Sequence, residues 1–299
     1  MKISILNRLT NKTETENVYY EGSIRFLYGN SFLSRTIGRF FLHTIFKWPC
    51  VAGLIGLIQK SSFSKRNIKP FIARFNIDAT EFAKNVDDFT SFNDFFIRSL
   101  KPGARKLSEA PIVIPADGRY RFYETIGKGD LFNVKGKSFC LQTLLRDEAL
   151  SKRFTDGSMV LARLCPTDVH RFYFPCNATP GPTRLINGPL YSVNPIAIKN
   201  NPWIYGTNRR TVTLLETPQF GKVAFLEIGA TSVGSIKQTF TPGKAYSKCD
   251  EKGYFEFGGS ALILLFEKGA IRFDDDLLKA SSQGIETHCL IGQSLGQVQ

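Results

Sequence analysis

Two glycines, one serine and an apolar run form the stretch that most constrains how this chain can fold. Gly258 and Gly259 stand directly before Ser260 and Ala261, and residues 262–266 are all apolar. Glycines allow a sharp bend and the apolar run predicts a strand, so Ser260 stands where a turn enters the core. A serine hydroxyl beside a bent peptide bond can attack the carbonyl before it, here that of Gly259, and the ester can lose the preceding chain by β-elimination. A loop before a buried strand is the simpler interpretation of these residues alone.

The composition is that of a large, folded and basic chain. Its 299 residues are 42% hydrophobic and include 26 Phe, so we expect a substantial core and little disorder. The formal charge of +13 favours an anionic partner such as a phospholipid surface, a nucleic acid or an acidic protein. Six cysteines without a CxxC pair and only three histidines argue against a zinc site, so no metal is expected. Scattered thiols fit a reducing compartment, and the early polar residues show no signal peptide.

The N-terminal quarter of the chain carries a long block without acidic residues. No Asp or Glu stands between Glu21 and Asp78, whereas Lys and Arg recur throughout the block. Residues 40–58 are apolar but contain Pro49, so we expect two short helices rather than a membrane span. Apolar faces flanked by basic residues and a Trp suit helices that lie on an anionic lipid surface. Ordinary core helices with solvated basic edges are the alternative.

The remainder of the chain is rich in strand and turn patterns. We expect a short amphipathic helix over residues 88–100 and another helix over 138–150. Strands are expected over 159–164, 212–215 and 223–228, a strand–turn unit over 189–195, and a last loop and strand over 284–296. The fold class is therefore α+β, with a β-rich core preceded by N-terminal amphipathic helices that associate with a membrane surface. We divide the chain into an N-terminal part, residues 1–75, and a catalytic core, residues 76–299.

His170 is the histidine best placed for chemistry, because it follows a Pro-Thr-Asp turn and precedes an arginine. Histidine is the usual group to take a serine proton near neutral pH. A carboxylate that orients the ring would complete the arrangement, and Asp117 and Asp168 are the candidates. A hydrogen-bonded structural histidine is the alternative. The glycine-containing segment 229–236 is not a phosphate loop, and residues 108–299 mix acids with bases, so we expect neither a nucleotide nor a nucleic-acid partner.

Taken together, these segments resemble the phosphatidylserine decarboxylase family, because several motifs occur in the family's order. The motifs are FNDFFIR at 92–98, KPGAR at 101–105, PADG at 115–118, PTDVHR at 166–171, PLYSVNP at 189–195, GATSVGSI at 229–236 and KCDEKGYFEFGGS at 248–260. Residues 32–41 are similar to the family's amphipathic N-terminal region. The resemblance covers residues 30–296.

The resemblance implies a proenzyme that cuts itself between Gly259 and Ser260 into a β chain, residues 1–259, and an α chain, residues 260–299. Ser260 would become a pyruvoyl group, the covalent cofactor, with His170 and Asp117 as further catalytic residues. Its ketone would form a Schiff base with the amine of phosphatidylserine and accept electrons as CO₂ leaves, giving phosphatidylethanolamine. The implied partner is an anionic phospholipid membrane. Because the chain is short and shows no leader, we expect peripheral attachment at the cytoplasmic face of a bacterial cell membrane. A homodimer is left open.

The chain departs from the family's pattern at three places. The family usually has a second histidine where this chain has Tyr173, and a neutral phenol is a poor base at pH 7. Ala261 stands where a Ser or Thr is usual, and Cys249 and Lys252 replace a glycine and an apolar residue. An unprocessed, catalytically inactive lipid-binding relative is therefore the alternative function. A pyruvoyl decarboxylase of another amine-bearing acid, and a basic nucleic-acid-binding protein, are the other hypotheses.

Overall fold

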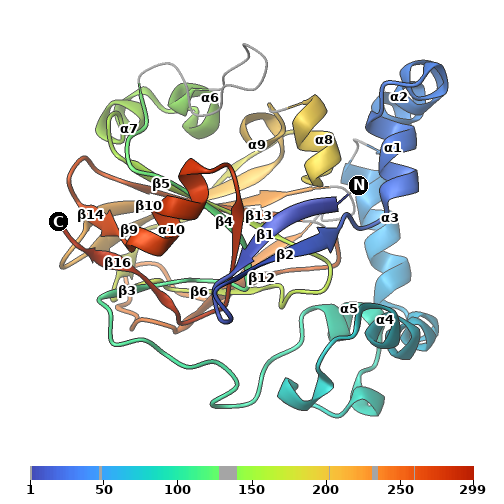
Figure 1. Cartoon of the computed structure of the whole chain (residues 1–299), viewed down its shortest axis with the longest axis horizontal. Coiled ribbons are helices and arrows are strands. Elements are labelled where there is room, and N and C mark those ends of the chain that lie inside the picture. Colours follow the sequence, from blue (N-terminus) through green and yellow to red (C-terminus); the bar gives the residue numbers. More distant parts are fainter. Residues whose placement is uncertain (1, 47–48, 128–139, 202, 231–234, 259) are drawn as a thin grey trace.

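The structure is a computed structural model that describes residues 2–46, 49–127, 140–201, 203–230, 235–258 and 260–299. Within these residues the chain has the predicted α+β class, with a β-rich core and helices on its outside (Figure 1). Gly259, on one side of the predicted cut, lies outside the described residues, and so do residues 231–234 and part of the predicted helix over 138–150.

A large sheet of ten described strands forms the centre of the molecule (Figure 1). Its order is β2-β1-β15-β4-β5-β13-β10-β9-β7, with β8 paired to β9 outside this path. Adjacent strands are antiparallel except β1 and β15, which are parallel. The strands are β1 (Lys2–Asn7), β2 (Lys12–Asn17), β4 (Gly118–Tyr123), β5 (Ser158–Leu164), β7 (Thr179–Pro180), β8 (Arg184–Ile186), β9 (Arg210–Thr217), β10 (Gly221–Gly229), β13 (Ser260–Phe266) and β15 (Glu286–Cys289).

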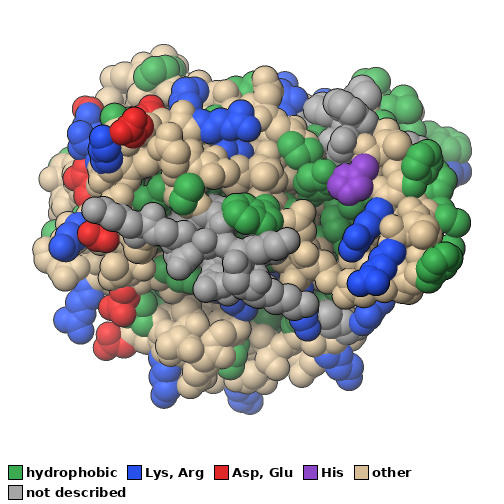
Figure 2. Space-filling view, turned by 90° about the horizontal axis from the view of Figure 1, so that it is seen from above, with side chains coloured by type: hydrophobic (Ala, Val, Ile, Leu, Met, Phe, Trp, Pro, Cys, Tyr) green, Lys and Arg blue, Asp and Glu red, His purple; other side chains and the backbone are tan. Residues whose placement is uncertain are grey.

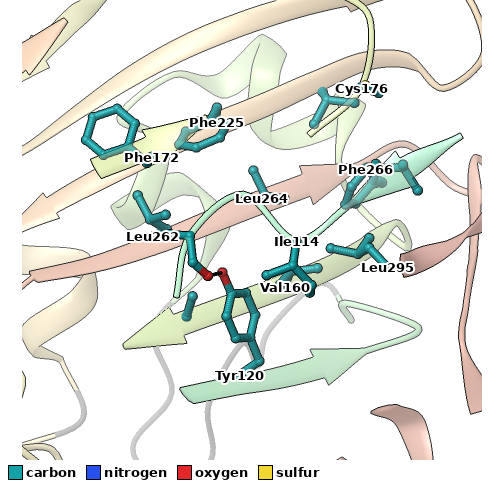
Figure 3. Packing of buried hydrophobic residues seen from close by; sticks show 14 of the residues in the cluster. Ile114, Tyr120, Val160, Phe172, Cys176, Phe225, Leu262, Leu264, Phe266 and Leu295 are labelled. Carbon is teal, nitrogen blue, oxygen red and sulfur yellow. Dashed lines mark hydrogen bonds between the residues drawn. The ribbon is translucent and has the colours of Figure 1, made fainter. Parts of the chain in front are cut away.

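Two three-stranded sheets pack near one face of the large sheet. One has the order β11-β12-β6 and the other β14-β16-β3. Their strands are β3 (Ile112–Val113), β6 (Arg171–Tyr173), β11 (Ile236–Gln238), β12 (Glu251–Phe255), β14 (Ile271–Phe273) and β16 (Ser294–Val298). Figure 3 shows Phe172 of β6 beside Phe225 of β10, with Leu262 and Leu264 of β13 in the same layer.

Strand β13 lies in the middle of the core because both of its faces are apolar. Leu262 and Leu264 belong to the cluster that the small sheets cover, whereas Ile263 and Leu265 belong to the cluster on the opposite face. Side chains alternate between the two faces of a strand, so an unbroken apolar run is the pattern of a strand covered on both sides. The strand predicted at 262–266 is confirmed, and those predicted at 159–164, 212–215 and 223–228 appear as β5, β9 and β10.

Helices cover the other face and one end of the large sheet (Figure 1). Those on the face include α6, α8 and α9, whose buried side chains join the second core cluster. The helices are α1 (Glu21–Tyr28), α2 (Arg39–Phe41), α3 (Pro49–Lys60), α4 (Ile68–Phe75), α5 (Phe92–Phe96), α6 (Leu141–Leu145), α7 (Glu148–Arg153), α8 (Pro195–Asn200), α9 (Ile204–Thr207) and α10 (Asp275–Ser282).

The acid-free block forms the helices α1 to α4 at one end of the molecule. Pro49 is the first described residue of α3, and residues 47–48 lie outside the described residues, so the helix break expected at Pro49 stays a prediction. In the described parts of the chain, no helix has both the length and the apolar character needed to span a bilayer. Several large apolar side chains of these helices and their connections are exposed, including Phe32, Phe40 and Leu57. Figure 2 shows hydrophobic and basic side chains together at this end, whereas the acidic side chains of that face gather at the opposite end.

Three predicted elements differ from the structure. The single helix over 138–150 is wrong, because Arg146 adopts φ 46° and separates α6 from α7. The segment 189–195 forms no strand, since the Asn208 side chain bonds both backbone groups of Tyr191 in place of a neighbouring strand. The helix expected over 88–100 is shorter, because Ser91 caps α5 at its start. Strands β1 and β2 lie in a polar stretch without a clear period.

Candidate active site

Ser260 is the first residue of β13 and lies inside the protein. It pairs with Gly229 of β10 and with Leu164 of β5, and its residue is fully buried. Alternation along the strand places its side chain on the same face as Leu262, toward the small sheets. Among the described residues, none accepts from or donates to its hydroxyl oxygen. A buried hydroxyl without a hydrogen-bond partner costs free energy, so the stability of the fold gives no reason for a serine at this position.

The segment before Ser260 is fastened to its surroundings by several contacts. The amide of Phe255 donates to the backbone oxygen of His170 over 2.9 Å, and the amide of Phe257 donates to Oδ1 of Asn93 over 2.9 Å. Gly258 has φ 137°, a conformation open to glycine and rarely to other residues. The bend expected from the two glycines is therefore present at Gly258. These contacts place the chain that enters Ser260 against both His170 and α5.

His170 is fully buried beside this segment. Its ring lies over that of Phe96, with 3.8 Å between centroids and 32° between the planes. Its Nδ1 lies 3.0 Å from the backbone oxygen of Asp168; a carbonyl can only accept, so Nδ1 carries the proton and Nε2 carries the lone pair. Within the described part of the chain Nε2 has no hydrogen-bond partner. Burial lowers the pKa of His170 to about 3, against the opposing charge of Asp168, so the ring is neutral at about pH 7 and Nε2 keeps its lone pair, while the same burial makes this nitrogen a weaker base than a solvated imidazole.

Asp168 holds the loop that carries His170. Its two carboxylate oxygens lie 2.6 and 2.7 Å from NH1 of Arg119, and the amide of Cys165 donates to one of them over 2.7 Å. Burial acts to raise the pKa of Asp168, but the Arg119 charge outweighs burial and leaves that pKa below its ordinary value. The carboxylate therefore fixes the loop, and its backbone oxygen orients the imidazole.

Asp117 lies in a different set of contacts. Arg105 donates to its carboxylate from NH2 over 2.7 Å and from Nε over 3.2 Å, and the amide of Ile291 donates over 2.8 Å. The hydrogen bond that orients His170 comes from the backbone of Asp168, while the Asp117 carboxylate is paired with Arg105. The catalytic role expected for Asp117 stays a prediction.

Tyr173 lies at the end of β6, at the position where the resemblance implies a second histidine. Burial, with a smaller contribution from Glu251, raises the pKa of Tyr173 to about 12. A phenol that holds its proton so tightly does not take the proton of a serine at neutral pH. His170 is therefore the better-placed base of the two.

A largely apolar cavity of about 470 Å³ opens beside the segment that enters Ser260. Phe96, Phe257 and Gly258 line one part of it. Another part is formed by α1 and α3, and Ser192 and Asn194 of the PLYSVNP motif contribute polar side chains. The cavity thus connects the N-terminal helices with the surroundings of Ser260 and His170. A cleft of this size and character is the usual form of a binding site for a small molecule or a lipid.

Two residues that matter for this geometry were missed by the sequence reasoning. Phe96 entered the predictions only as part of the helix over 88–100 and of the motif at 92–98, with no role of its own, and Arg119 did not enter them. The burial of an arginine cannot be read from its neighbours in the sequence, because its partner Asp168 is 49 residues away. The motif order of 92–98 and 166–171 was the one signal that could have connected Phe96 with His170.

The fold and the site together define an α+β protein with a buried serine and a neutral histidine beside an apolar cavity. The family model described as phosphatidylserine decarboxylase matches residues 92–297. A protein of Chlamydia pneumoniae named phosphatidylserine decarboxylase proenzyme is 49% identical over 300 residues, covering 100% of this chain and 98% of its own. Proteins of the same name from Chlamydia felis and Chlamydia trachomatis are 46% and 40% identical, over 99% and 98% of this chain and 98% and 96% of their own. The chain belongs to the phosphatidylserine decarboxylase family.

Proposed function

We propose that this chain is a proenzyme that cuts itself between Gly259 and Ser260 and then converts phosphatidylserine to phosphatidylethanolamine and CO₂. The observation that carries the proposal is the fully buried hydroxyl of Ser260, which has no described partner and directly follows the bend at Gly258. If residue 260 only had to start a strand, an apolar side chain would make the fold more stable, because a buried hydroxyl without a hydrogen bond costs free energy. The family of the chain and the names of its relatives support the same reaction.

The cut needs one nucleophile and one base, and the site offers both. The Ser260 oxygen attacks the carbonyl carbon of Gly259 and its proton goes to a base, for which the lone pair on Nε2 of His170 is the candidate. The bond between the Gly259 carbonyl carbon and the Ser260 nitrogen then breaks as that nitrogen takes a proton, which leaves an ester through Oγ and a free amine on residue 260. Loss of the Cα proton of residue 260 then breaks the Cβ–Oγ bond and releases the carboxylate of Gly259. Addition of water to the dehydrated residue releases ammonia and leaves a ketone, so the atoms balance without an external oxidant.

The residues around position 260 fit a pyruvoyl group. A ketone requires neither the hydroxyl nor the amine of the serine, and the Ser260 hydroxyl is already without a described hydrogen bond. Once formed, the group supplies an electron-accepting carbonyl for decarboxylation. His170 would hold a proton at Nε2 or release it beside that group, Phe96 would keep the imidazole in place, and the apolar lining of the cavity would exclude water.

The N-terminal part, residues 1–75, would bring the catalytic core, residues 76–299, to its substrate. Exposed apolar side chains with nearby arginines and lysines suit peripheral binding to an anionic bilayer, and a bacterial cell membrane is the proposed location at its cytoplasmic face. Because α1 and α3 also line the cavity, a lipid held at these helices has a short apolar route to Ser260. After the cut, the α chain would stay bound through β13, which pairs with β5 and β10 of the β chain.

Intact mass of the freshly purified protein under denaturing conditions tests the cut. We expect two chains divided at Gly259/Ser260, the smaller one lighter by one ammonia than the product of simple hydrolysis. Ser260→Ala should give one uncut chain, and persistence of two fragments in that variant would exclude the assignment. Release of ¹⁴CO₂ from carboxyl-labelled phosphatidylserine, compared with lyso-lipid and free serine, tests the substrate. A single unmodified wild-type chain that binds vesicles without releasing CO₂ would favour the inactive lipid-binding relative instead.

A further inference from the structure

The N-terminal hairpin of β1 and β2 extends the large sheet and contacts the proposed α chain. β1 runs parallel to β15, with Ile5 opposite Glu286. Arg8, at the end of β1, donates to Asp274 over 2.8 Å and to Asp276 over 2.7 Å. The hairpin is therefore fixed to the core by its backbone and by ion pairs. It also lies outside residues 92–297, which the family model matches.

Glu16 of β2 connects this hairpin with the residues that hold His170. Its Oε1 accepts from NH2 of Arg119 over 2.6 Å, and its Oε2 accepts from Nε of Arg119 over 3.0 Å. The remaining terminal nitrogen of Arg119 is the one that bonds both oxygens of Asp168. Glu16, Arg119 and Asp168 have side chains that are 12%, 6% and 7% exposed, so solvent screens these ion pairs little.

A second contact connects the residues that follow β2 with the loop over 165–170, which carries His170. The Tyr19 hydroxyl lies 3.2 Å from Oγ1 of Thr167, one residue before Asp168. The backbone oxygen of Tyr19 accepts from Nδ2 of Asn194 over 3.0 Å, which fixes the chain that leaves β2. Glu16, Tyr19 and the residues between them line the 470 Å³ cavity. The hairpin thus forms a wall of the cavity and holds the loop at two points.

From these contacts we infer that the hairpin completes the active site and that Glu16 is a positioning residue for His170; this inference rests on the proposed function. Glu16 accepts one hydrogen bond from each of two nitrogens of Arg119, which fixes the orientation of the guanidinium. Because the third nitrogen bonds Asp168, the position of Asp168 is fixed as well. The backbone oxygen of Asp168 then sets the imidazole plane and keeps the proton on Nδ1. Without the Glu16 carboxylate, Arg119 can rotate, the loop over 165–170 relaxes, and Nε2 loses its fixed direction.

The test compares Glu16→Gln with Glu14→Gln in the full-length protein. Glu14 stands two residues earlier on the same strand and is exposed, so the control removes a carboxylate of the same hairpin away from Arg119. Turnover is measured on vesicles of phosphatidylserine and phosphatidylcholine. We expect kcat to fall about 10- to 100-fold in Glu16→Gln with KM nearly unchanged, because the base is displaced while the lipid still binds. Glu14→Gln should match the wild type.

An NMR measurement of the histidine rings separates positioning from general damage. The chain has three histidines, so ring signals of ¹³C,¹⁵N-histidine-labelled protein can be assigned by single substitutions at His43 and His288. Glu16→Gln should shift the signal of His170, and Glu14→Gln should not. Equal kcat and equal His170 signals in the two variants would overturn the inference.

Two further outcomes are distinguishable. If Glu16→Gln gives no folded protein, Glu16→Asp is measured in the same way, since it keeps the charge but is too short to bond both nitrogens of Arg119; unchanged kcat and an unchanged His170 signal would then overturn the inference. If the wild type releases no CO₂, the proposed function fails, and the His170 signal in Glu16→Gln alone decides whether the hairpin positions the ring.

Discussion

Nζ of Lys252 lies 2.5 Å from Oε1 of Glu227, and neither side chain is exposed to solvent. Thr213 and Gln238 also accept from the ammonium group, and the ring of Phe225 lies 4.6 Å from it. A bulge in the pairing of β12 with β6 turns Lys252 inward. The pair therefore connects β12 with β10. Strand β12 leads to the predicted cut, and β10 pairs with Ser260.

Lys252→Met should destabilise the protein by about 3–5 kcal/mol, because it leaves the Glu227 carboxylate buried without its counter-charge. The double variant Glu227→Leu/Lys252→Met should recover most of this loss, since an apolar pair needs no compensation. Urea unfolding in a Ser260→Ala background, where the chain stays uncut, gives the free energies. Lys222→Met is the control, because its partner Glu216 is largely exposed and the expected cost is below about 1 kcal/mol. Equal losses in Lys252→Met and Lys222→Met would contradict the prediction.

The burial of His170 predicts a stability that falls in acid. Its pKa is about 3 in the folded protein and about 6.5 in an unfolded chain, so the unfolded state binds more protons between these values. The free energy of unfolding should therefore decrease by about 1.4 kcal/mol per pH unit as the pH falls below 6.5. Denaturant titrations between about pH 7 and pH 4 should show a shallower slope for His170→Gln than for its parent, both in the Ser260→Ala background. Asp168 also has a lowered pKa, but its contribution is common to both proteins. Parallel curves would mean that His170 is not held neutral.

Tyr173→Phe should cut itself at nearly the wild-type rate. The pKa of Tyr173 is raised to about 12, so its phenol supplies no base whose loss could matter at neutral pH. The time course of the two chains on a denaturing gel, after expression in a cell-free system, measures the rate. Tyr173→His is the companion variant, and we expect it to be tolerated if the pocket keeps the family's geometry. A cut that stops in Tyr173→Phe would show that the hydroxyl takes part in the reaction.

The central strands could be predicted from the sequence because their apolar runs decide their environment locally. Residues 262–266 need cover on both faces, and only the middle of a sheet between two packed layers provides it. The strand β2 could not be predicted in this way, since Lys12–Asn17 is polar and owes its conformation to pairing with β1. The inward turn of Lys252 was equally hidden, because the bulge that causes it depends on a partner strand far away in the sequence.

The residues of the candidate site that lie in the ordered motifs could be predicted from the sequence. Ser260 and His170 were found by their neighbours, and the structure leaves Oγ of Ser260 and Nε2 of His170 buried without a described hydrogen-bond partner. The bonds that position them were not found, since Arg119 reaches Asp168 and Glu16 across 49 and 103 residues of sequence. Charge pairs of this kind depend on contacts between segments far apart in the sequence, here β2, β4 and the loop that carries His170.

Replacing two exposed phenylalanines should weaken binding to anionic vesicles. Phe32 and Phe40 are 83% and 63% exposed on the connection to α2 and on α2 itself, and insertion of such a side chain into the bilayer interface is worth about 1.5–3 kcal/mol. Phe32→Ser/Phe40→Ser should therefore lower the partition coefficient by tenfold or more in a sedimentation assay with phosphatidylserine vesicles. Leu185→Ser is the control, because this residue is also exposed but lies on β8, away from the N-terminal helices. Phe32 and Phe40 do not line the cavity, so turnover on vesicles should fall with binding, whereas turnover on a dispersed short-chain substrate should not. Equal binding by the double variant and the control would place the lipid surface elsewhere on the molecule.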